Sequence, residues 1–546
     1  MTSTLYRHGV VHSAADPFAE AILVDDGAVA WLGSDDTADG FVDRADEVVD
    51  LDGALVTPGF VDAHVHVLET GLARQGVDLS ATGPVRGLED ALAAMRSALA
   101  ARPTAEADEP LLGFGWDEHT WAERRPPTRA ELDAAGGGAP VYLARADLHS
   151  AVVSTSLAER AGLSSLPGWR DDGWVTGSAH QRARDVARTL TAQRRSALCD
   201  EALRSMAARG VVAVHEMSAP FIDTRAGLRE LLEATAAAAS GLPLVVGYRA
   251  EACVTVDDAR ALLEAVPGLA GIGGDLNVDG SLGSRTAALR APYADDPTTS
   301  GALQLTAEQV ANHVTAVTRA GVHAGFHVIG DLAMDELLIG MRAAADVEGL
   351  MAVAGAGHRI EHAEMVDAPT LAALVLLGVR VSSQPAFDAT WGGPSGMYAA
   401  RLGAGRAAAL NPLADLAAAG VPLAFGSDSP VTAVDPWAGV RAAVLHTAPD
   451  QRISGRAALR AATRGGWRLA GLDDTGAGEL RVGAPAHLAV WRAERLGVHG
   501  AQRGLTAWSP EARAGLPLLP DLSPGEVPPQ CLRTVRGGVT LFDTFT

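Results

Sequence analysis

The sequence contains no lysine, so all 44 of its Lys and Arg side chains are arginine. Any chemistry that depends on a lysine side chain is therefore excluded. Cysteine is scarce as well: Cys199, Cys253 and Cys531 are scattered along the chain and form neither a disulfide framework nor a Cys-x-x-Cys metal site. This usage is typical of a protein of the reducing cytoplasm, and we expect that location.

Long apolar runs and an excess of positive charge are also missing. Uncharged apolar segments such as residues 370–379 are too short to span a bilayer, and the N-terminus lacks the basic start and apolar core of a signal peptide. The formal net charge of -22 argues against binding to nucleic acid or to an anionic membrane surface. We therefore expect a small molecule as the partner.

The middle of the chain alternates short apolar strands with helices rich in Ala, Leu and Glu. Examples are the strand at residues 210–218 before a helical segment at 226–239, and the strand at 321–331 before a helical segment at 332–347. Repeated strand–helix units with buried strands predict a parallel sheet in an α/β fold. Seven or eight such units fit a closed (β/α)8 TIM barrel better than a doubly wound sheet, and no Gly-x-Gly-x-x-Gly turn indicates a dinucleotide site.

The two ends of the chain and one internal segment depart from this alternation. The predicted units are a composite β-sandwich domain from both termini (1–57 and 470–546), the barrel (58–75 and 201–469) and an inserted α/β subdomain over the barrel mouth (76–200). The insert follows the first barrel strand. Within the tail, residues 497–530 are rich in Pro and Gly and predict a long surface excursion.

Histidines and one carboxylate stand at the ends of the predicted barrel strands. His64 and His66 alternate along one strand, so both side chains project to the same face. His327, His362 and Asp428 each end a further strand, and the carboxyl ends of barrel strands meet at the mouth where active sites lie. Because imidazole and carboxylate groups bind zinc and related ions, this convergence predicts a metal site with an open position for water.

Five motifs make the chain resemble a known group of enzymes. In order they are PGFVDAHVH, DGSLGSRTAAL, HVIGD, RIEHAEM and GSDSPV. As a set they resemble the amidohydrolase superfamily, most closely the amidohydrolase 3 branch of YtcJ-like hydrolases, which are related to N-substituted formamide deformylases and D-aminoacylases. Residues 113–133 and 140–163 are also typical of that branch. The resemblance covers nearly the whole chain and implies a metal-dependent hydrolase and, at the family level, a homo-oligomer.

The resemblance also implies roles for the predicted ligands. His64 and His66 would bind an inner metal ion, with Asp428 as its carboxylate ligand and the general base of the reaction. His327 and His362 would bind a second ion where a second ion is present. The reaction implied is hydrolysis of a carbon–nitrogen bond outside peptide chains by metal-activated water.

The missing lysine matters for the number of metal ions. In many family members a carbamylated lysine on the fourth strand bridges two ions, and its place here falls on Asp275. Asp275 then either bridges as a carboxylate, although its side chain is far shorter, or plays a structural part beside a single ion. In the second case the ligands are His64, His66, His327 and Asp428, and His362 is a catalytic hydrogen-bonding group. We favour one ion, zinc before iron, manganese or cobalt.

Five residues are candidate substrate contacts: Trp116, Asp117 and His149 in the insert, and Arg285 and Gln384 in barrel loops. For Trp116 the alternative is packing in the core of the insert, and for Arg285 it is a structural salt bridge. Arg359 and Glu361 flank His362 on alternate strand positions, so we expect them to face away from it and to be structural.

Three functions stay open at this point. The favoured one is hydrolysis of a small amide, formamide, carbamate or N-acyl compound. The second is an aminohydrolase that deaminates a heterocycle, which would release ammonia without a carboxylic acid. The third is a barrel that has lost catalysis and serves as a binding protein, which would hold no metal.

Overall fold

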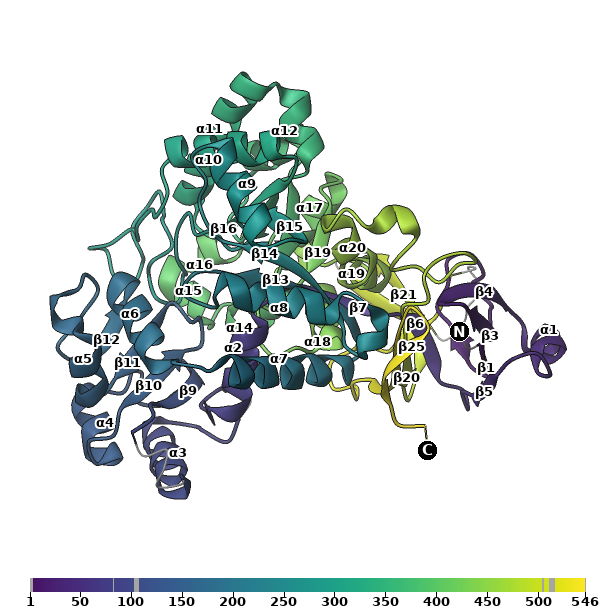
Figure 1. The fold of residues 1–546 in the computed structure, drawn as a ribbon, viewed down its shortest axis with the longest axis horizontal. Helices are drawn as coiled ribbons and strands as arrows, with labels where there is room; N and C mark the ends of the chain where they lie inside the picture. The colour runs from purple at the N-terminus through teal and green to yellow at the C-terminus, as the bar shows by residue number, and fades with distance from the viewer. Residues whose placement is uncertain (1–2, 82, 103–107, 503–504, 510–515, 546) are drawn as a thin grey trace.

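The computed structural model describes residues 3–81, 83–102, 108–502, 505–509 and 516–545, and its centre is a parallel sheet of eight strands. The strands are β7 (Phe60–Val65), β13 (Val211–Ser218), β14 (Leu244–Arg249), β15 (Leu269–Ile272), β16 (His323–Val328), β17 (Arg359–His362), β18 (Arg380–Ser383) and β19 (Leu423–Phe425). They lie side by side in chain order. Figure 1 shows them surrounded by helices at the middle of the molecule.

The first and last strands close the sheet into a barrel. The amide of Asp428 donates to the carbonyl of His64 at 2.8 Å, and the amide of His66 donates to the carbonyl of Ser429 at 3.0 Å. All residues of β7, β13, β16 and β17 are buried, as expected of parallel strands covered on both faces. The predicted TIM barrel is therefore confirmed.

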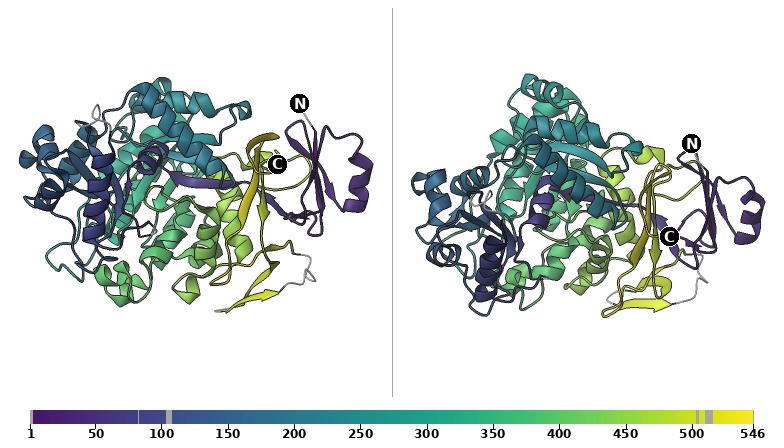
Figure 2. Two further views of the ribbon diagram at one scale, coloured as in Figure 1. Left: turned by 90° about the horizontal axis from the view of Figure 1, so that it is seen from below. Right: turned by 60° about the horizontal axis from the view of Figure 1, so that its bottom comes forward.

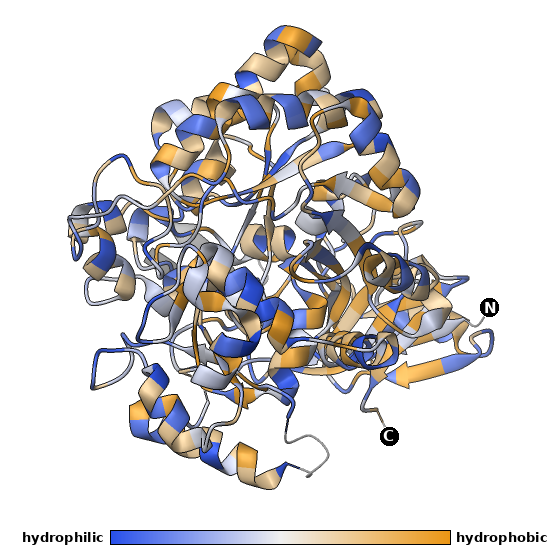
Figure 3. Ribbon diagram, turned by 60° about the vertical axis from the view of Figure 1, so that its left-hand side comes forward, coloured by the Kyte–Doolittle hydropathy of each residue, from blue (hydrophilic) through white to orange (hydrophobic). Residues whose placement is uncertain are grey.

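Helices form the outer layer of the barrel. They are α2 (Val67–Gln75), α7 (Ala192–Ala207), α8 (Arg225–Thr235), α9 (Val256–Ala265), α10 (Ala307–Ala320), α11 (Asp331–Glu348), α13 (Ala368–Leu376), α17 (Leu413–Ala418), α18 (Pro436–Val444), α19 (Gly455–Ala462) and α20 (Arg464–Leu469). Thr255 and Thr306 start α9 and α10 with capping boxes. These helices carry both hydrophobic and hydrophilic residues (Figure 3), so one face packs on the strands while the other meets water.

Both termini build one domain beside the barrel. One sheet has the order β4-β3-β1-β5 and the other the order β2-β6-β20-β24-β25. Their strands are β1 (Thr4–Arg7), β2 (Val10–Val11), β3 (Ala21–Asp25), β4 (Ala28–Gly33), β5 (Glu47–Asp50), β6 (Leu55–Pro58), β20 (Leu488–Arg492), β24 (Gln530–Arg536) and β25 (Val539–Asp543). Tyr6, Ile22, Val56 and Val490 lie in their shared core. Gly59 alone separates β6 from β7, so this domain leads directly into the first barrel strand.

The insert has a sheet of its own, of order β12-β11-β10-β9-β8, with its own helices. Its elements are β8 (Val77–Asp78), α3 (Leu88–Ala101), β9 (Leu111–Trp116), α4 (Arg129–Gly136), β10 (Val141–Arg145), β11 (Ser150–Val153), α5 (Thr155–Ala161), β12 (Trp174–Thr176) and α6 (Gly177–Ala187). Figure 2 shows it at the end of the barrel opposite the terminal sheets. The boundary predicted at residue 200 falls inside α7, which packs on α2 as a barrel helix.

The Pro- and Gly-rich part of the tail contains more structure than the predicted excursion. β21 (Leu496–Gln502) pairs with β22 (Leu505–Ser509) and with β23 (Leu519–Pro520). Residues 503–504 and 510–515 of that prediction lie outside the described residues. Among the helices of the described residues, none has both the length and the apolar character needed to cross a bilayer.

Candidate metal centre

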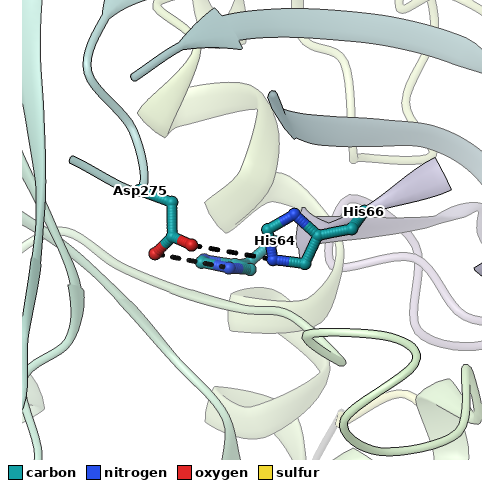
Figure 4. A group of neighbouring side chains, drawn as sticks. All are labelled: His64, His66 and Asp275. Atoms are coloured by element: carbon teal, nitrogen blue, oxygen red, sulfur yellow. Dashed lines mark ion pairs between the residues drawn. The ribbon is translucent and has the colours of Figure 1, made fainter. Parts of the chain in front are cut away.

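Five buried side chains and one partly buried carboxylate, that of Asp275, meet at the carboxyl ends of the barrel strands. His64 and His66 come from the end of β7, His327 from β16 and His362 from β17, while Asp275 and Asp428 lie three residues beyond β15 and β19. The four imidazoles are nearly inaccessible, with exposed fractions of 0% to 6%. Figure 4 shows the Asp275 carboxylate facing the rings of His64 and His66. The structure therefore brings together all the ligands that the sequence predicts, Asp275 included.

The inner group consists of His64, His66 and Asp428. Oδ1 of Asp428 lies 3.2 Å from Nε2 of His64 and 3.2 Å from Nε2 of His66. Two ligand atoms on a tetrahedral zinc ion lie about 3.3 Å apart, because each is roughly 2 Å from the metal. Both distances from Oδ1 of Asp428 therefore match an edge of a tetrahedral coordination shell.

The outer group consists of His327, His362 and Asp275. Nδ1 of His327 lies 3.0 Å from Nε2 of His362 and 3.1 Å from Oδ1 of Asp275. Asp275 also faces the inner pair: Oδ1 is 3.9 Å from Nε2 of His64, and Oδ2 is 3.7 Å from Nε2 of His66. The short aspartate thus stands between the two histidine pairs, at the position where the resemblance places a bridging lysine.

The inner histidines have their second ring nitrogens occupied by oxygen acceptors. Nδ1 of His64 lies 2.8 Å from Oε2 of Glu361, and Nδ1 of His66 lies 2.9 Å from the carbonyl oxygen of Met217. A carboxylate and a carbonyl only accept hydrogen bonds, so each Nδ1 carries the proton. The Nε2 lone pairs are then directed at the centre, which is the form of histidine that binds metals.

Each outer histidine also donates from one ring nitrogen to an oxygen and turns the other nitrogen to the centre, but the nitrogen that donates differs between the two rings. Nε2 of His327 donates to the carbonyl of Gly280 at 3.2 Å, which leaves Nδ1 facing the centre. Nδ1 of His362 donates to Oε1 of Gln384 at 2.8 Å, which leaves Nε2 facing the centre. Two lone pairs 3.0 Å apart repel each other unless a cation or a proton lies between them.

Two atoms of the inner group are left without a hydrogen-bond partner in the described part of the chain. Nε2 of His64 and Oδ1 of Asp428 are buried and have no hydrogen-bond partner among the described residues. An unpaired buried acceptor costs free energy, so such atoms point to a ligand that the side chains were arranged to hold. A divalent cation fits both groups of donors.

The electrostatics of the centre favour positive charge. Burial disfavours a charged imidazole, yet the Asp428 carboxylate raises the pKa of His64 well above its ordinary value. Against the same effect of burial, Asp275 raises the pKa of His327 to about 9. Without a cation this arrangement holds protons instead, so binding of a metal at neutral pH must release them.

The backbone is strained at two of these residues. His362 has φ 70° and Asp428 has φ 54°, both in the left-handed region that few residues other than glycine adopt. Such conformations occur where function requires a particular side-chain direction. At both strand ends the turn directs the side chain into the centre.

Glu361 makes a contact with the metal centre that the sequence did not predict. It does face away from His362, but it reaches across the barrel to Nδ1 of His64, and Arg359 donates to it from the same strand. Both residues are fully buried. A charged pair inside a strand that is otherwise buried was the available signal, because a barrel interior tolerates such a pair only where it has a partner.

Replacing Glu361 with Gln is expected to weaken metal binding by about 10- to 100-fold, because an amide orients and polarises His64 less than a carboxylate does. Competition with a chromogenic chelator measures the affinity. The same change at Glu348, a half-buried residue at the end of α11 that pairs with Arg319 at 2.7 Å, is the matched control. Equal affinities in the Glu361 variant and the wild type would contradict the assignment.

The predicted substrate contacts in the insert divide into two groups. Trp116 packs against Trp121 and Trp174 and donates from Nε1 to the carbonyl of Leu143, so it belongs to the core of the insert. Asp117 is buried and accepts from Arg145 and Trp391. His149 differs from both, because it lines the cavity above the centre and its ring lies 5.1 Å from that of His327.

The two predicted contacts from the barrel also differ from each other. Arg285 pairs with Asp295 at 2.8 Å and is not among the residues that line the cavity, in agreement with the salt-bridge alternative. Gln384 orients His362 from behind rather than facing the cavity.

A cavity of about 710 Å³ opens above the metal centre. His66, Asp275, His327 and Asp428 line its floor. The insert supplies much of its wall, including residues 147–149 and 176–178. The insert therefore covers the barrel mouth, and a small molecule in this cavity meets both units.

Comparison with known proteins identifies the group to which the chain belongs. A model described as "Amidohydrolase family" matches residues 47–542. The chain belongs to the amidohydrolase family. As an amidohydrolase it is a hydrolase of carbon–nitrogen bonds, as the resemblance implied. The mouth of its barrel, with two histidine pairs and two aspartates, is the part of the enzyme suited to metal-assisted chemistry.

Three known proteins show which amidohydrolases this chain is similar to. YtcJ of Bacillus subtilis (strain 168), an amidohydrolase by name, is 27% identical over 459 residues, which cover 79% of this chain and 81% of YtcJ. The N-substituted formamide deformylase of Arthrobacter pascens is 29% identical over 152 residues, 28% of this chain and 27% of that enzyme. The crystal structure of a metal-dependent hydrolase from Pyrococcus furiosus has a TM-score of 0.68 and 27% identity, and the match covers 89% of this chain and 98% of that one.

Proposed function

We propose that this amidohydrolase uses divalent metal, zinc before iron, manganese or cobalt, to hydrolyse the carbon–nitrogen bond of a small amide, formamide, carbamate or N-acyl compound. The observation that carries the proposal is the inner group: two imidazole Nε2 atoms lie 3.2 Å from one buried oxygen of Asp428. The similarity to a formamide deformylase supports the substrate class.

We further propose that the centre holds two ions. His64, His66 and Asp428 would hold one, His327 and His362 the other, and Asp275 would contact both. This departs from the single ion that the missing lysine favoured. The support is the position of the Asp275 carboxylate, within 3.1 to 3.9 Å of a nitrogen on each of the four histidines.

The chemistry divides between the metal and the protein. When bound, a divalent metal supplies the Lewis acidity that makes hydroxide available near neutral pH. With Oδ1 as the ligating oxygen, Asp428 takes the proton of the attacking water at Oδ2 and later delivers it to the leaving nitrogen. His64 and His66 keep the pKa of Asp428 below its usual range against the effect of burial, so the carboxylate is ionised and ready to accept.

His362 is better suited to ligation than to proton donation. Burial lowers its pKa, so the ring is neutral, and its single N–H is engaged by Gln384. Its Nε2 therefore offers a lone pair to the centre and has no hydrogen to donate to a substrate oxygen.

The proposed reaction is tested by product analysis. Protein purified without chelator is assayed against matched N-formyl and N-acyl amines, N-acyl amino acids and carbamates. We expect at least one compound to yield equimolar acid and amine, with activity lost on chelation and restored by zinc or manganese. Release of ammonia without a carboxylic acid would favour the heterocycle deaminase, and absence of both turnover and bound metal would favour a binding protein.

A further inference from the structure

One wall of the cavity is a face of helix α6. His180, Gln181 and Arg184 line the cavity at helical spacing, so their side chains project from one side of α6. His66, Asp275 and Asp428 line the same cavity. A molecule whose reacting bond lies at the metal centre therefore extends into a space that Arg184 also faces.

Arg184 is buried and lacks a strong partner. Its exposed fraction is 5%. One terminal N–H donates to the carbonyl of Leu148 at 3.1 Å, and the guanidinium lies 5.6 Å from the ring centroid of Phe221. Its Nε is buried without a hydrogen-bond partner, and no ion pair of Arg184 occurs among the described residues. Burying a guanidinium in this way is costly unless an anion joins it.

The nearest carboxylate does not neutralise Arg184. Both oxygens of Glu69 accept from Arg188, which is one helical turn further along the chain. Burial disfavours the charged form of Arg184, but Glu69 and the Tyr142 hydroxyl keep its pKa raised, so the group is a cation. Because Glu69 and Arg188 balance each other, the positive charge of Arg184 remains.

The other charged side chains that line the cavity either have partners or belong to the metal centre. Asp147 faces Arg145 at 3.1 Å and accepts from the hydroxyls of Ser281 and Ser284. Asp275 and Asp428 belong to the metal centre. Arg184 is therefore the cavity-lining cation that has an unpaired N–H and no carboxylate, which is the pattern of a site for a ligand anion.

We propose that Arg184 recognises a carboxylate on the part of the substrate remote from the scissile bond. This inference rests on the proposed function and narrows it: within the amide and N-acyl class, the enzyme takes acidic members such as N-acyl amino acids. The planar guanidinium suits a carboxylate because two parallel hydrogen bonds can form. Neutral amides of the same size leave the charge unpaired and bind less well.

The test compares matched probes on the metal-loaded enzyme. Each probe pair is an N-acetyl amino acid and its C-terminal carboxamide, with leucine and phenylalanine in both enantiomers. Isothermal titration calorimetry gives Kd, and initial rates give kcat and KM where hydrolysis occurs. We expect at least one acid to bind roughly tenfold or more tightly than its carboxamide. Wild-type enzyme that binds no acid, or binds both members equally, overturns the proposal.

Variants assign the preference to one side chain. Arg184→Gln is expected to reduce the preference for the acid to less than about twofold and to raise KM with little change in kcat. Arg184→Lys keeps the charge and is expected to retain part of the preference. Arg182→Gln is the matched control, because Arg182 lies on the same helix, is exposed and is not among the cavity-lining residues. Thermal unfolding verifies that each variant is folded, and an undiminished preference in folded Arg184→Gln overturns the proposal.

Failure of this inference and failure of the proposed reaction give different results. Asp428→Asn is expected to lower kcat by about 10²- to 10⁴-fold and to keep the preference for the acid. Normal hydrolysis by Asp428→Asn would overturn the proposed mechanism without affecting Arg184. A wild-type enzyme that shows normal metal-dependent hydrolysis but no preference for the acid would overturn the role of Arg184 and leave the proposed mechanism unaffected.

Discussion

Replacement of Asp428 by Asn is expected to lower kcat by about 10²- to 10⁴-fold while the enzyme keeps much of its metal. Oδ1 of Asp428 lies 3.2 Å from Nε2 of His64 and of His66, and the amide oxygen of Asn can take the same position. An amide, however, cannot take a proton from water at neutral pH. The effect is measured as kcat on the best substrate of the panel, with metal content by mass spectrometry.

Asp435→Asn is the matched control for this experiment. Asp435 follows the same strand and caps α18 by accepting from the amide of Ala438. Asn caps helices about as well as Asp does, so this variant should keep both activity and metal. A near-normal rate in Asp428→Asn would refute the role of Asp428 as the base.

Replacement of Asp275 by Ala is expected to reduce bound metal from about two ions to one or fewer per chain and to remove most activity. Asp275 has oxygens within 3.9 Å of a nitrogen on all four histidines, and without it the lone pairs of His327 and His362, 3.0 Å apart, lose the carboxylate that lies 3.1 Å from His327. Equilibrium dialysis against zinc followed by metal analysis gives the stoichiometry independently of turnover.

Two outcomes contradict the two-ion proposal. Wild-type enzyme that is fully active with one ion would restore the single-ion site, and an Asp275→Ala enzyme that still binds two would exclude Asp275 as the shared ligand. Asp296→Ala is the control, because Asp296 lies in the same loop after β15, is exposed and contacts Thr298. That variant should keep the wild-type stoichiometry.

The convergence of the metal ligands was predictable because it follows from strand geometry. Alternation along β7 and into the residue after it puts His64 and His66 on one face. Parallel barrel strands end at the same rim, so the ends of β16, β17 and β19 bring their ligands to the same place. None of this requires knowledge of a loop or of a contact between distant side chains.

The position of Asp275 depends on backbone that strand periodicity does not describe. Gly273 and Gly274 follow β15 with φ of 115° and 75°. A Cβ on Gly273 would lie 2.1 Å from the carbonyl oxygen of Gly325, so only glycine fits this turn. The two glycines bend the chain beside β16 immediately before Asp275. Their conformation allows a short side chain to take a place expected for a much longer one.

Glu361 and Arg184 were missed for a related reason. Glu361 meets His64 across the inside of the barrel, and Arg184 meets the cavity only because the insert folds over the mouth. Both contacts join segments that are distant in sequence. Residue type and local pattern do not specify such pairs, whereas the packed structure does.

The backbone hydrogen bonds that close the barrel determine when the metal can be acquired. His64 lies on the first barrel strand, His66 directly follows it and Asp428 follows the last strand, and main-chain hydrogen bonds join the two ends. A growing chain that ends before Asp428 presents only part of the inner group. In the proposed centre the inner ion would therefore reach full coordination only after the final strand has docked, so metal loading would report a completed barrel.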